Sequence, residues 1–121
     1  MKKNILYRLP VIVYCLFIFW QSSSASPDTL PTFAHVDKVL HLCGYALLGG
    51  LVARMLLHET LAFSRRNLMI AAMVFSTLYG AGDEFHQSFV AERSADVFDV
   101  VADGVGSVLG VVLYAWTQKT T

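Results

Sequence analysis

The sequence predicts an all-α fold, a four-transmembrane-helix bundle that forms a single domain over residues 1–121. Hydrophobic residues make up 55% of the chain and charged residues only 15%, far from the balance of a water-soluble domain. The apolar residues are gathered into separate long stretches and do not alternate with polar ones, as barrel strands would require. Because backbone groups in hydrocarbon must be satisfied within their own segment, these stretches are expected to be helices.

The apolar stretches place the expected spans at about residues 6–22, 37–57, 66–84 and 97–116. A span needs about 20 mostly apolar residues. The second and fourth stretches meet this length directly, whereas the first and third need their polar flanks, through Ser22 and Glu84, at membrane depth. Residues 21–36 contain Pro27 and Pro31 and are typical of an irregular external loop.

The distribution of basic residues predicts that both termini are cytoplasmic. Of the nine Lys and Arg residues, only Lys38 and Arg93 fall on the opposite side. The others flank the two ends and the second connection: Lys2, Lys3, Arg8, Arg54, Arg65, Arg66 and Lys119. We therefore expect a multi-pass protein of the bacterial cytoplasmic membrane, surrounded by the lipid bilayer.

The overall charge of the chain bears on one class of ligand. The formal net charge is zero, so overall charge provides no basis for binding nucleic acid.

Residues 1–26 resemble a secretory signal peptide, because Lys2 and Lys3 precede an apolar run that ends in small residues around Ala25. The local pattern leaves cleavage of the first span and its retention open as alternatives.

The second span begins with a polar stripe. Asp37, His41 and Tyr45 recur at intervals of four residues, which places them on one helix face. Lys38 lies beside Asp37 and can extend toward the interface. Taken singly, Asp37 could equally be a helix N-cap and His41 a hydrogen-bonded core histidine.

The third span ends with a similar stripe of Tyr79, Asp83 and Gln87, with Glu84 one residue further round the helix. Adjacent carboxylates at a helix C-terminus repel each other and oppose the helix dipole. We therefore expect a partner outside this helix to compensate the Asp83–Glu84 pair.

The fourth span carries a stripe of acidic residues followed by glycines: Asp96, Asp99, Asp103, Gly106 and Gly110. Asp96 and Asp99 suit the first turn, where the helix dipole favours anions. Asp103 lies about 10 Å deeper, where a lone carboxylate costs at least about 2.5–3.5 kcal/mol. It must be protonated, paired or hydrogen-bonded inside the bundle. The glycines favour close contact with a neighbouring helix.

The three stripes can converge on one outward-facing cavity. An alternative is a salt-bridged polar network around Arg93 and Lys38 that only fixes the register of the helices in a membrane scaffold. Two cations would then face at least five carboxylates, an excess that suggests protonation, a bound cation or an external ligand.

At these positions the chain resembles the VanZ-like family of small integral membrane proteins. The resemblance is carried by Asp37-Lys38-x-x-His41-x-x-x-Tyr45, by Tyr79-x-x-x-Asp83-Glu84-x-x-Gln87-x-Phe89-x-x-x-Arg93, and by Asp96-x-x-Asp99-x-x-x-Asp103-x-x-Gly106-x-x-x-Gly110. Gln21-Ser22-Ser23-Ser24 also resembles the family and favours retention of the first span. The family often has Asn where this chain has Asp103. The resemblance implies a cell-envelope protein and a link to antibiotic resistance, through tolerance of glycopeptides such as teicoplanin.

Our leading hypothesis is that the cavity binds an amphiphilic, lipid-linked or glycopeptide ligand of the cell envelope. The candidate residues are Asp37, Lys38, His41, Tyr45, Tyr79, Asp83, Glu84, Gln87, Phe89, Arg93, Asp96, Asp99 and Asp103. Arg93 and Lys38 would engage phosphate or carboxylate groups. The alternative is an intramembrane enzyme that uses an acid–base pair or a metal ion. No cofactor is predicted; a divalent cation, if bound, would be held by His41, Asp83, Glu84 and Asp99.

Overall fold

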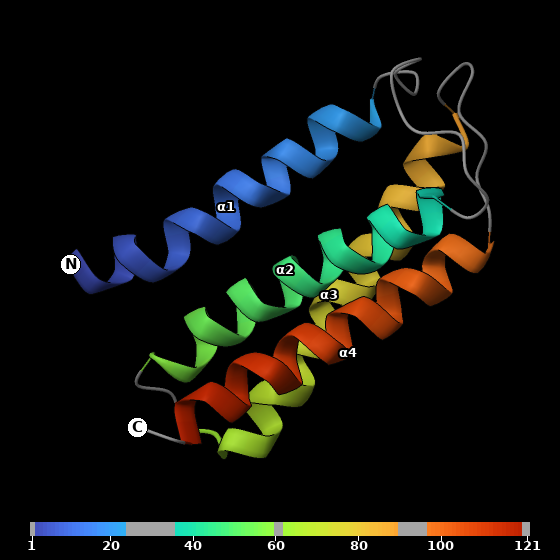
Figure 1. The fold of residues 1–121 in the computed structure, drawn as a ribbon. Helices are drawn as coiled ribbons and strands as arrows, with labels where there is room; N and C mark the ends of the chain where they lie inside the picture. The colour runs from blue at the N-terminus through green and yellow to red at the C-terminus, as the bar shows by residue number, and fades with distance from the viewer. Residues whose placement is uncertain (1, 24–35, 60–61, 90–96, 120–121) are drawn as a thin grey trace.

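The computed structural model describes residues 2–23, 36–59, 62–89 and 97–119. These residues form four helices, α1 (Lys2–Ser22), α2 (Val36–Leu57), α3 (Arg65–Gln87) and α4 (Val97–Lys119). Figure 1 shows the start of α1 and the end of α4 toward the same end of the bundle. The predicted all-helical fold is confirmed, and each helix begins and ends within a few residues of its expected span.

Three of the described helices are long and apolar enough to cross a membrane: Asn4–Ser22 in α1, Lys38–Leu57 in α2 and Val97–Gln118 in α4. Their outward side chains suit hydrocarbon, since large apolar residues such as Leu16, Trp20 and Trp116 are exposed on the bundle surface. The third helix, with 23 residues, has spanning length but is not among these three.

The lower hydropathy of α3 follows from its ends and from its buried face. Arg65 and Arg66 begin the helix, and Asp83 and Glu84 lie in its last turns. The buried face contains mainly small and polar residues: Leu68, Ala72, Ser76, Gly80, Glu84 and Gln87. Ser64 caps the helix by accepting a hydrogen bond from the Asn67 amide at 3.2 Å.

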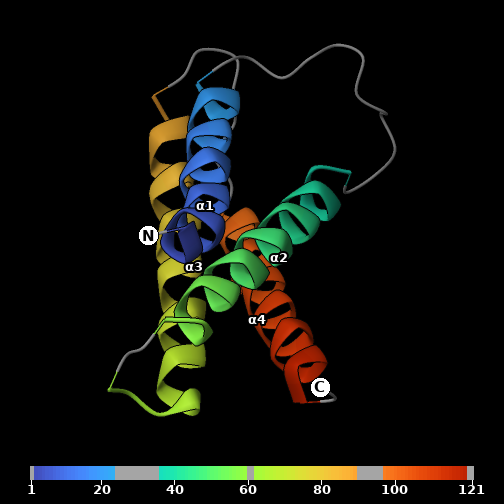
Figure 2. The ribbon, with the colours of Figure 1, turned by 90° about the vertical axis from the view of Figure 1, so that its left-hand side faces the viewer.

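Glycines allow α2 and α4 to cross in direct backbone contact (Figure 2). A Cβ added at Gly49 would lie 2.5 Å from the Ser107 carbonyl oxygen. A Cβ at Gly106 would overlap the Leu42 carbonyl, and one at Gly110 would overlap that of Ala46. This confirms the prediction that the glycines after Asp103 permit close helix packing.

The first helix packs on α2 and α3, and within the described ranges its backbone does not come close to that of α4. The Tyr14 hydroxyl donates to the Gly44 carbonyl at 2.8 Å, and the Tyr79 hydroxyl donates to the Cys15 carbonyl at 2.5 Å. At its end, Ser22 Oγ lies 3.2 Å from Nδ1 of His86. These contacts attach α1 at two levels of the bundle.

Pro10 lies inside α1 and leaves one backbone carbonyl without its helical donor. Proline has no N–H, so it cannot donate to the carbonyl of Leu6, four residues earlier. The Arg54 guanidinium of α2 donates to this carbonyl at 3.1 Å and also stacks over the Tyr7 ring, 4.5 Å from its centroid. A side chain on α2 thus satisfies the group that the proline leaves exposed.

Candidate functional site

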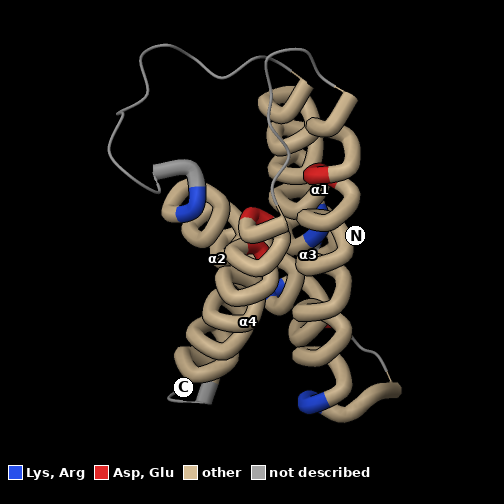
Figure 3. Tube along the Cα trace, turned by 90° about the vertical axis from the view of Figure 1, so that its right-hand side faces the viewer, with Lys and Arg blue, Asp and Glu red and all other residues tan. Residues whose placement is uncertain are grey.

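A buried polar cluster lies at the end of the bundle where α2 and α4 begin and α3 ends. We define this polar cluster as Lys38, His41 and Tyr45 of α2, Asp83 and Glu84 of α3, and Asp99 and Asp103 of α4. In Figure 3 the acidic positions of α3 and α4 lie in the upper part of the bundle, with a basic position at the start of α2. A basic position at the start of α3 marks the opposite end.

The deepest pair in the polar cluster joins His41 to Asp103. The two side chains approach to 2.7 Å between Nδ1 and Oδ1, and Asp103 is 0% exposed. With Asp103 ionised, Nδ1 of His41 carries the proton and donates it. This pairing is the compensation that a carboxylate at this depth requires, because a buried charge needs a hydrogen-bonded partner.

Asp99 lies one turn above Asp103 and contacts Lys38 and His41 of α2. Its Oδ1 lies 3.1 Å from Lys38 Nζ, and its Oδ2 lies 3.8 Å from Nε2 of His41. It is 3% exposed and belongs to the first turn of α4, where the positive end of the helix dipole stabilises an anion. His41 therefore stands between two carboxylates of α4.

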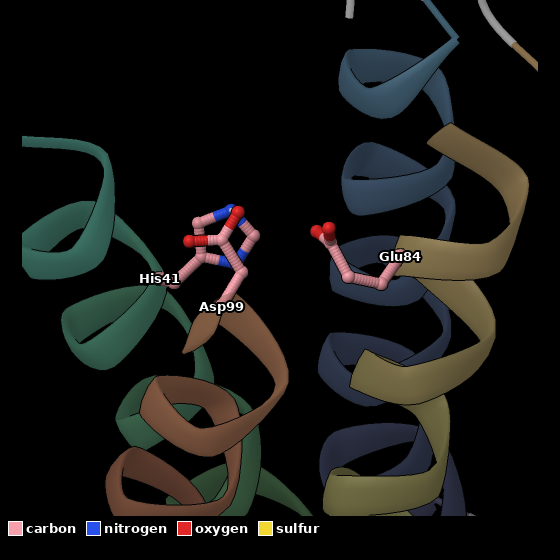
Figure 4. Close-up of side chains that lie close together, drawn as sticks. All are labelled: His41, Glu84 and Asp99. Atoms are coloured by element: carbon pink, nitrogen blue, oxygen red, sulfur yellow. The ribbon is translucent and has the colours of Figure 1, made fainter. Parts of the chain in front are cut away.

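The adjacent carboxylates of α3 face different partners. Asp83 accepts a hydrogen bond from the Tyr45 hydroxyl at 3.2 Å. Glu84 is 5% exposed, and Figure 4 shows its carboxylate directed toward His41 and Asp99. The starts of α2 and α4 lie at the same end of the bundle as the last turns of α3. The positive dipole ends of α2 and α4 therefore offset the negative dipole end of α3, which is unfavourable for its two carboxylates. These features supply the non-local compensation expected from the sequence.

Within the described part of the chain, the buried side-chain oxygens without a hydrogen-bond donor include Oδ2 of Asp103 and Oγ of Ser76. Oδ2 lies against Gly80, where an added Cβ would approach it to 2.6 Å. Gly80 thus makes room for the Asp103 carboxylate. A wholly buried carboxylate oxygen without a donor is costly and calls for a proton or a bound group.

Residues 4–118 match the model of the VanZ/LLP1 family, which is nearly the whole chain. The chain belongs to the VanZ/LLP1 family. The match begins inside α1 and ends inside α4, so it includes α2, α3 and most of the other two helices. No curated protein matches it, and no solved structure does.

The remaining candidate residues of this VanZ/LLP1 protein make other contacts than the members of the polar cluster or lie outside the described residues. Gln87 is buried at the end of α3, whereas Tyr79 donates to α1 and Phe89 is exposed beside Phe85. Arg93, Asp96 and the side chain of Asp37 fall outside the described residues.

Sequence reasoning missed the buried position of Ser76 and the contact of His86 with α1. The His86 ring stacks on Phe19 at 4.8 Å between centroids, in addition to its contact with Ser22. Ser76 and Gly80 lie one turn apart on the stripe that leads to Glu84, and this spacing was the available signal for Ser76.

Chemically, the polar cluster combines an imidazole, an ammonium group and several carboxylates in an apolar bundle. The His41–Asp103 pair is suited to exchanging a proton, and the carboxylates are suited to binding cations. Among its members, Lys38 and a protonated His41 are the only groups that can carry positive charge, against four carboxylates. Among the described members of the polar cluster, acidic groups therefore outnumber basic ones.

Proposed function

We propose that this VanZ/LLP1 protein binds the polar head group of an amphiphilic or lipid-linked cell-envelope ligand. One observation carries the proposal: polar side chains from α2, α3 and α4, far apart in sequence, meet inside an apolar bundle. Buried ionisable groups in membrane proteins are costly and commonly mark ligand or ion sites. A purely structural network would leave fewer carboxylates in excess.

The proposal places the protein in the bacterial cytoplasmic membrane, with both termini cytoplasmic and the polar cluster near the outer face. The distribution of Lys and Arg supports this orientation. In this proposal α3 also crosses the membrane, in addition to the three helices that are long and apolar enough to do so. Packing against α2 and α4 buries the small and polar face of α3, so its low hydropathy does not leave that face in contact with lipid.

In this proposal, basic groups contact the anionic part of the ligand. Lys38 lies at the rim of the polar cluster and is partly exposed, and Arg93 follows α3 in the sequence. His41, Asp83, Glu84 and Gln87 would orient hydroxyl, amide or amine groups of the head group. The ligand class includes polyprenyl diphosphates and glycopeptides, and binding of a glycopeptide would connect this protein with teicoplanin tolerance.

The test is thermal unfolding of the protein in lipid nanodiscs, with either a polyprenyl diphosphate or teicoplanin added as the probe. We expect one of the probes to raise the unfolding temperature, and Lys38→Ala and Arg93→Ala to remove at least half of that rise. Arg66→Ala, at the opposite end of α3, is the matched control and should behave as wild type. No shift with either probe, or equal shifts in all variants, would contradict the proposal.

A second candidate function, an intramembrane acid–base enzyme acting on a lipid-linked substrate, is favoured by the His41–Asp103 pair. Such an enzyme differs from a simple binding protein because it would release a chemically changed ligand. Incubation with a radiolabelled polyprenyl diphosphate should then yield a labelled product, and His41→Asn should abolish turnover even at substrate concentrations that saturate binding. Unchanged substrate after prolonged incubation counts against this candidate and leaves the binding proposal in place.

A further inference from the structure

We propose that His41, Glu84 and Asp99 form a binding site for a divalent first-row transition-metal ion, with Asp103 holding the His41 ring. One donor atom from each of the three residues lies within 4.8 Å of the other two. The donors come from α2, α4 and α3 and point toward one another (Figure 4). Zinc–ligand distances are about 2.0–2.2 Å. Rotation of the Glu84 side chain, which is longer than that of Asp99, would bring its carboxylate to this distance from an ion held by His41 and Asp99.

The orientation of His41 supports ligation through Nε2. Nδ1 is occupied by Asp103 at 2.7 Å, which leaves Nε2 directed toward Asp99 Oδ2 at 3.8 Å. Metal-binding histidines commonly donate their other ring N–H to a carboxylate, which fixes the ring and makes the ligating nitrogen more basic. Asp103 occupies that position here, so it acts as a positioning residue rather than a ligand.

The electrostatics of the polar cluster also favour a bound cation. Glu84 and Asp99 are more than nine-tenths buried, at 5% and 3% exposure. The neighbouring Asp103 is 0% exposed, and its Oδ2 has no hydrogen-bond donor among the described residues. Lys38 contacts Asp99 through Oδ1, so Oδ2 of the same carboxylate still faces His41. Counting only the described residues of the polar cluster, a divalent ion would offset the negative charge that Lys38 alone does not balance.

The donor set indicates the class of ion and its use. One imidazole with two carboxylates suits Zn²⁺, Mn²⁺ or Fe²⁺, whereas Mg²⁺ and Ca²⁺ prefer oxygen ligands alone. Three protein ligands leave at least one coordination position open. This part of the inference rests on the proposed function: the open position would accept a phosphate oxygen of the lipid-linked ligand. It explains how an acidic cluster can bind an anionic head group.

The direct test measures metal binding by the full-length protein purified in detergent without a histidine tag. After treatment with chelator and dialysis, we expect the wild type to take up one Zn²⁺ per chain. Co²⁺ in place of Zn²⁺ should show visible absorption typical of nitrogen and oxygen ligation. His41→Ala, Glu84→Gln and Asp99→Asn should each weaken Zn²⁺ binding at least tenfold, and Asp103→Asn should weaken it about tenfold.

Matched controls separate the site from other donors on the chain. His86→Ala removes a histidine at the same end of the bundle, and Glu59→Gln removes a carboxylate at the other end; both should bind Zn²⁺ as wild type does. Glu84→Gln changes only one heavy atom of the side chain, so the variant should fold as the wild type does. Its unfolding temperature verifies this. No Zn²⁺ uptake by the wild type, or uptake unaffected by Glu84→Gln and Asp99→Asn, would overturn the metal site.

The two proposals fail in different ways. If the polyprenyl diphosphate stabilises metal-free protein as strongly as Zn²⁺-loaded protein, the bridging role is wrong and head-group binding stands. If the protein takes up Zn²⁺ through these residues but responds to no probe, the metal site stands and the proposed function is wrong. If Zn²⁺ is required for stabilisation by the polyprenyl diphosphate, both are supported.

Discussion

At the scale of single residues, His41 links the acidic side chains of α4 to α2. It contacts Asp103 at 2.7 Å through one ring nitrogen and approaches Asp99 at 3.8 Å through the other. A carboxylate that is 0% exposed in an apolar bundle depends on such a partner. The effect of removing His41 should therefore depend on whether Asp103 is still present.

We predict that His41→Ala lowers the free energy of unfolding by about 3 kcal/mol, the usual cost of leaving a buried charge without its partner. Asp103→Asn in the His41→Ala background should recover part of this loss, since the amide carries no charge. Unfolding by SDS in mixed micelles, applied to the wild type, both single variants and the double variant, measures the coupling. Strictly additive effects would show that the two side chains do not interact.

At the scale of helices, the crossing of α2 and α4 depends on glycines at the contact. Alanine at Gly106 or Gly110 would push a methyl group into the backbone of α2, at Leu42 or Ala46. Backbone atoms cannot move aside as a flexible side chain can, so the two helices would have to separate. Gly82 provides the contrast, because an added Cβ there meets nothing within 4 Å.

We predict that Gly106→Ala and Gly110→Ala each destabilise the bundle by about 1–3 kcal/mol, the usual cost of overpacking. Gly82→Ala should be neutral or stabilising by up to about 1 kcal/mol, because alanine is the better helix former. The same SDS unfolding assay compares the three variants. A loss at Gly82 as large as that at Gly110 would contradict the close-contact explanation.

A second element-scale prediction concerns the proline in α1. Arg54→Ala removes the donor to the Leu6 carbonyl and should cost about 1 kcal/mol. Pro10→Ala restores a backbone N–H for that carbonyl, so it should stabilise the Arg54→Ala protein more than it stabilises the wild type. A double-mutant cycle of unfolding free energies checks this, and equal gains in both backgrounds would rule out the compensation.

At the scale of the whole molecule, the two ends of the bundle differ in chemistry. One end contains the polar cluster. The other has exposed or shallow contacts, among them the Arg8–Glu59 ion pair at 2.6 Å and the stacking of Tyr7 on His58 at 4.5 Å between centroids. Aromatic and basic side chains of this kind are typical of a membrane interface.

The proposed topology predicts the outcome of reporter fusions. Green fluorescent protein fused after Thr121 should fluoresce, and alkaline phosphatase fused there should be inactive, since both report a cytoplasmic end. Alkaline phosphatase fused after residue 23, at the end of α1, should be active. Activity of alkaline phosphatase at the C-terminus would reverse the orientation and place the polar cluster at the cytoplasmic face.

Much of the fold could be predicted from the sequence because apolar length and polar flanks are local properties. The bounds of all four helices came close to the expected ones, and the i, i+4 spacing identified the faces that carry His41 and Asp103. The hydropathy of α3 by itself is too low to identify this helix as a membrane span. Its inward face is small and polar because it contacts other helices rather than lipid, and a local average cannot separate these two causes.

The sequence by itself determined the helical class, the helix boundaries and the position of Asp83, Glu84, Asp99 and Asp103 at one end of the bundle. Only the tertiary structure decided which of them meet: His41 with Asp103, Lys38 with Asp99, Tyr45 with Asp83, and Tyr79 with α1 instead of the polar cluster. The physical reason is that spacing along a helix fixes the face on which a side chain lies. The rotation and crossing of two helices depend on backbone contacts, such as Gly110 against Ala46, that form between distant parts of the chain.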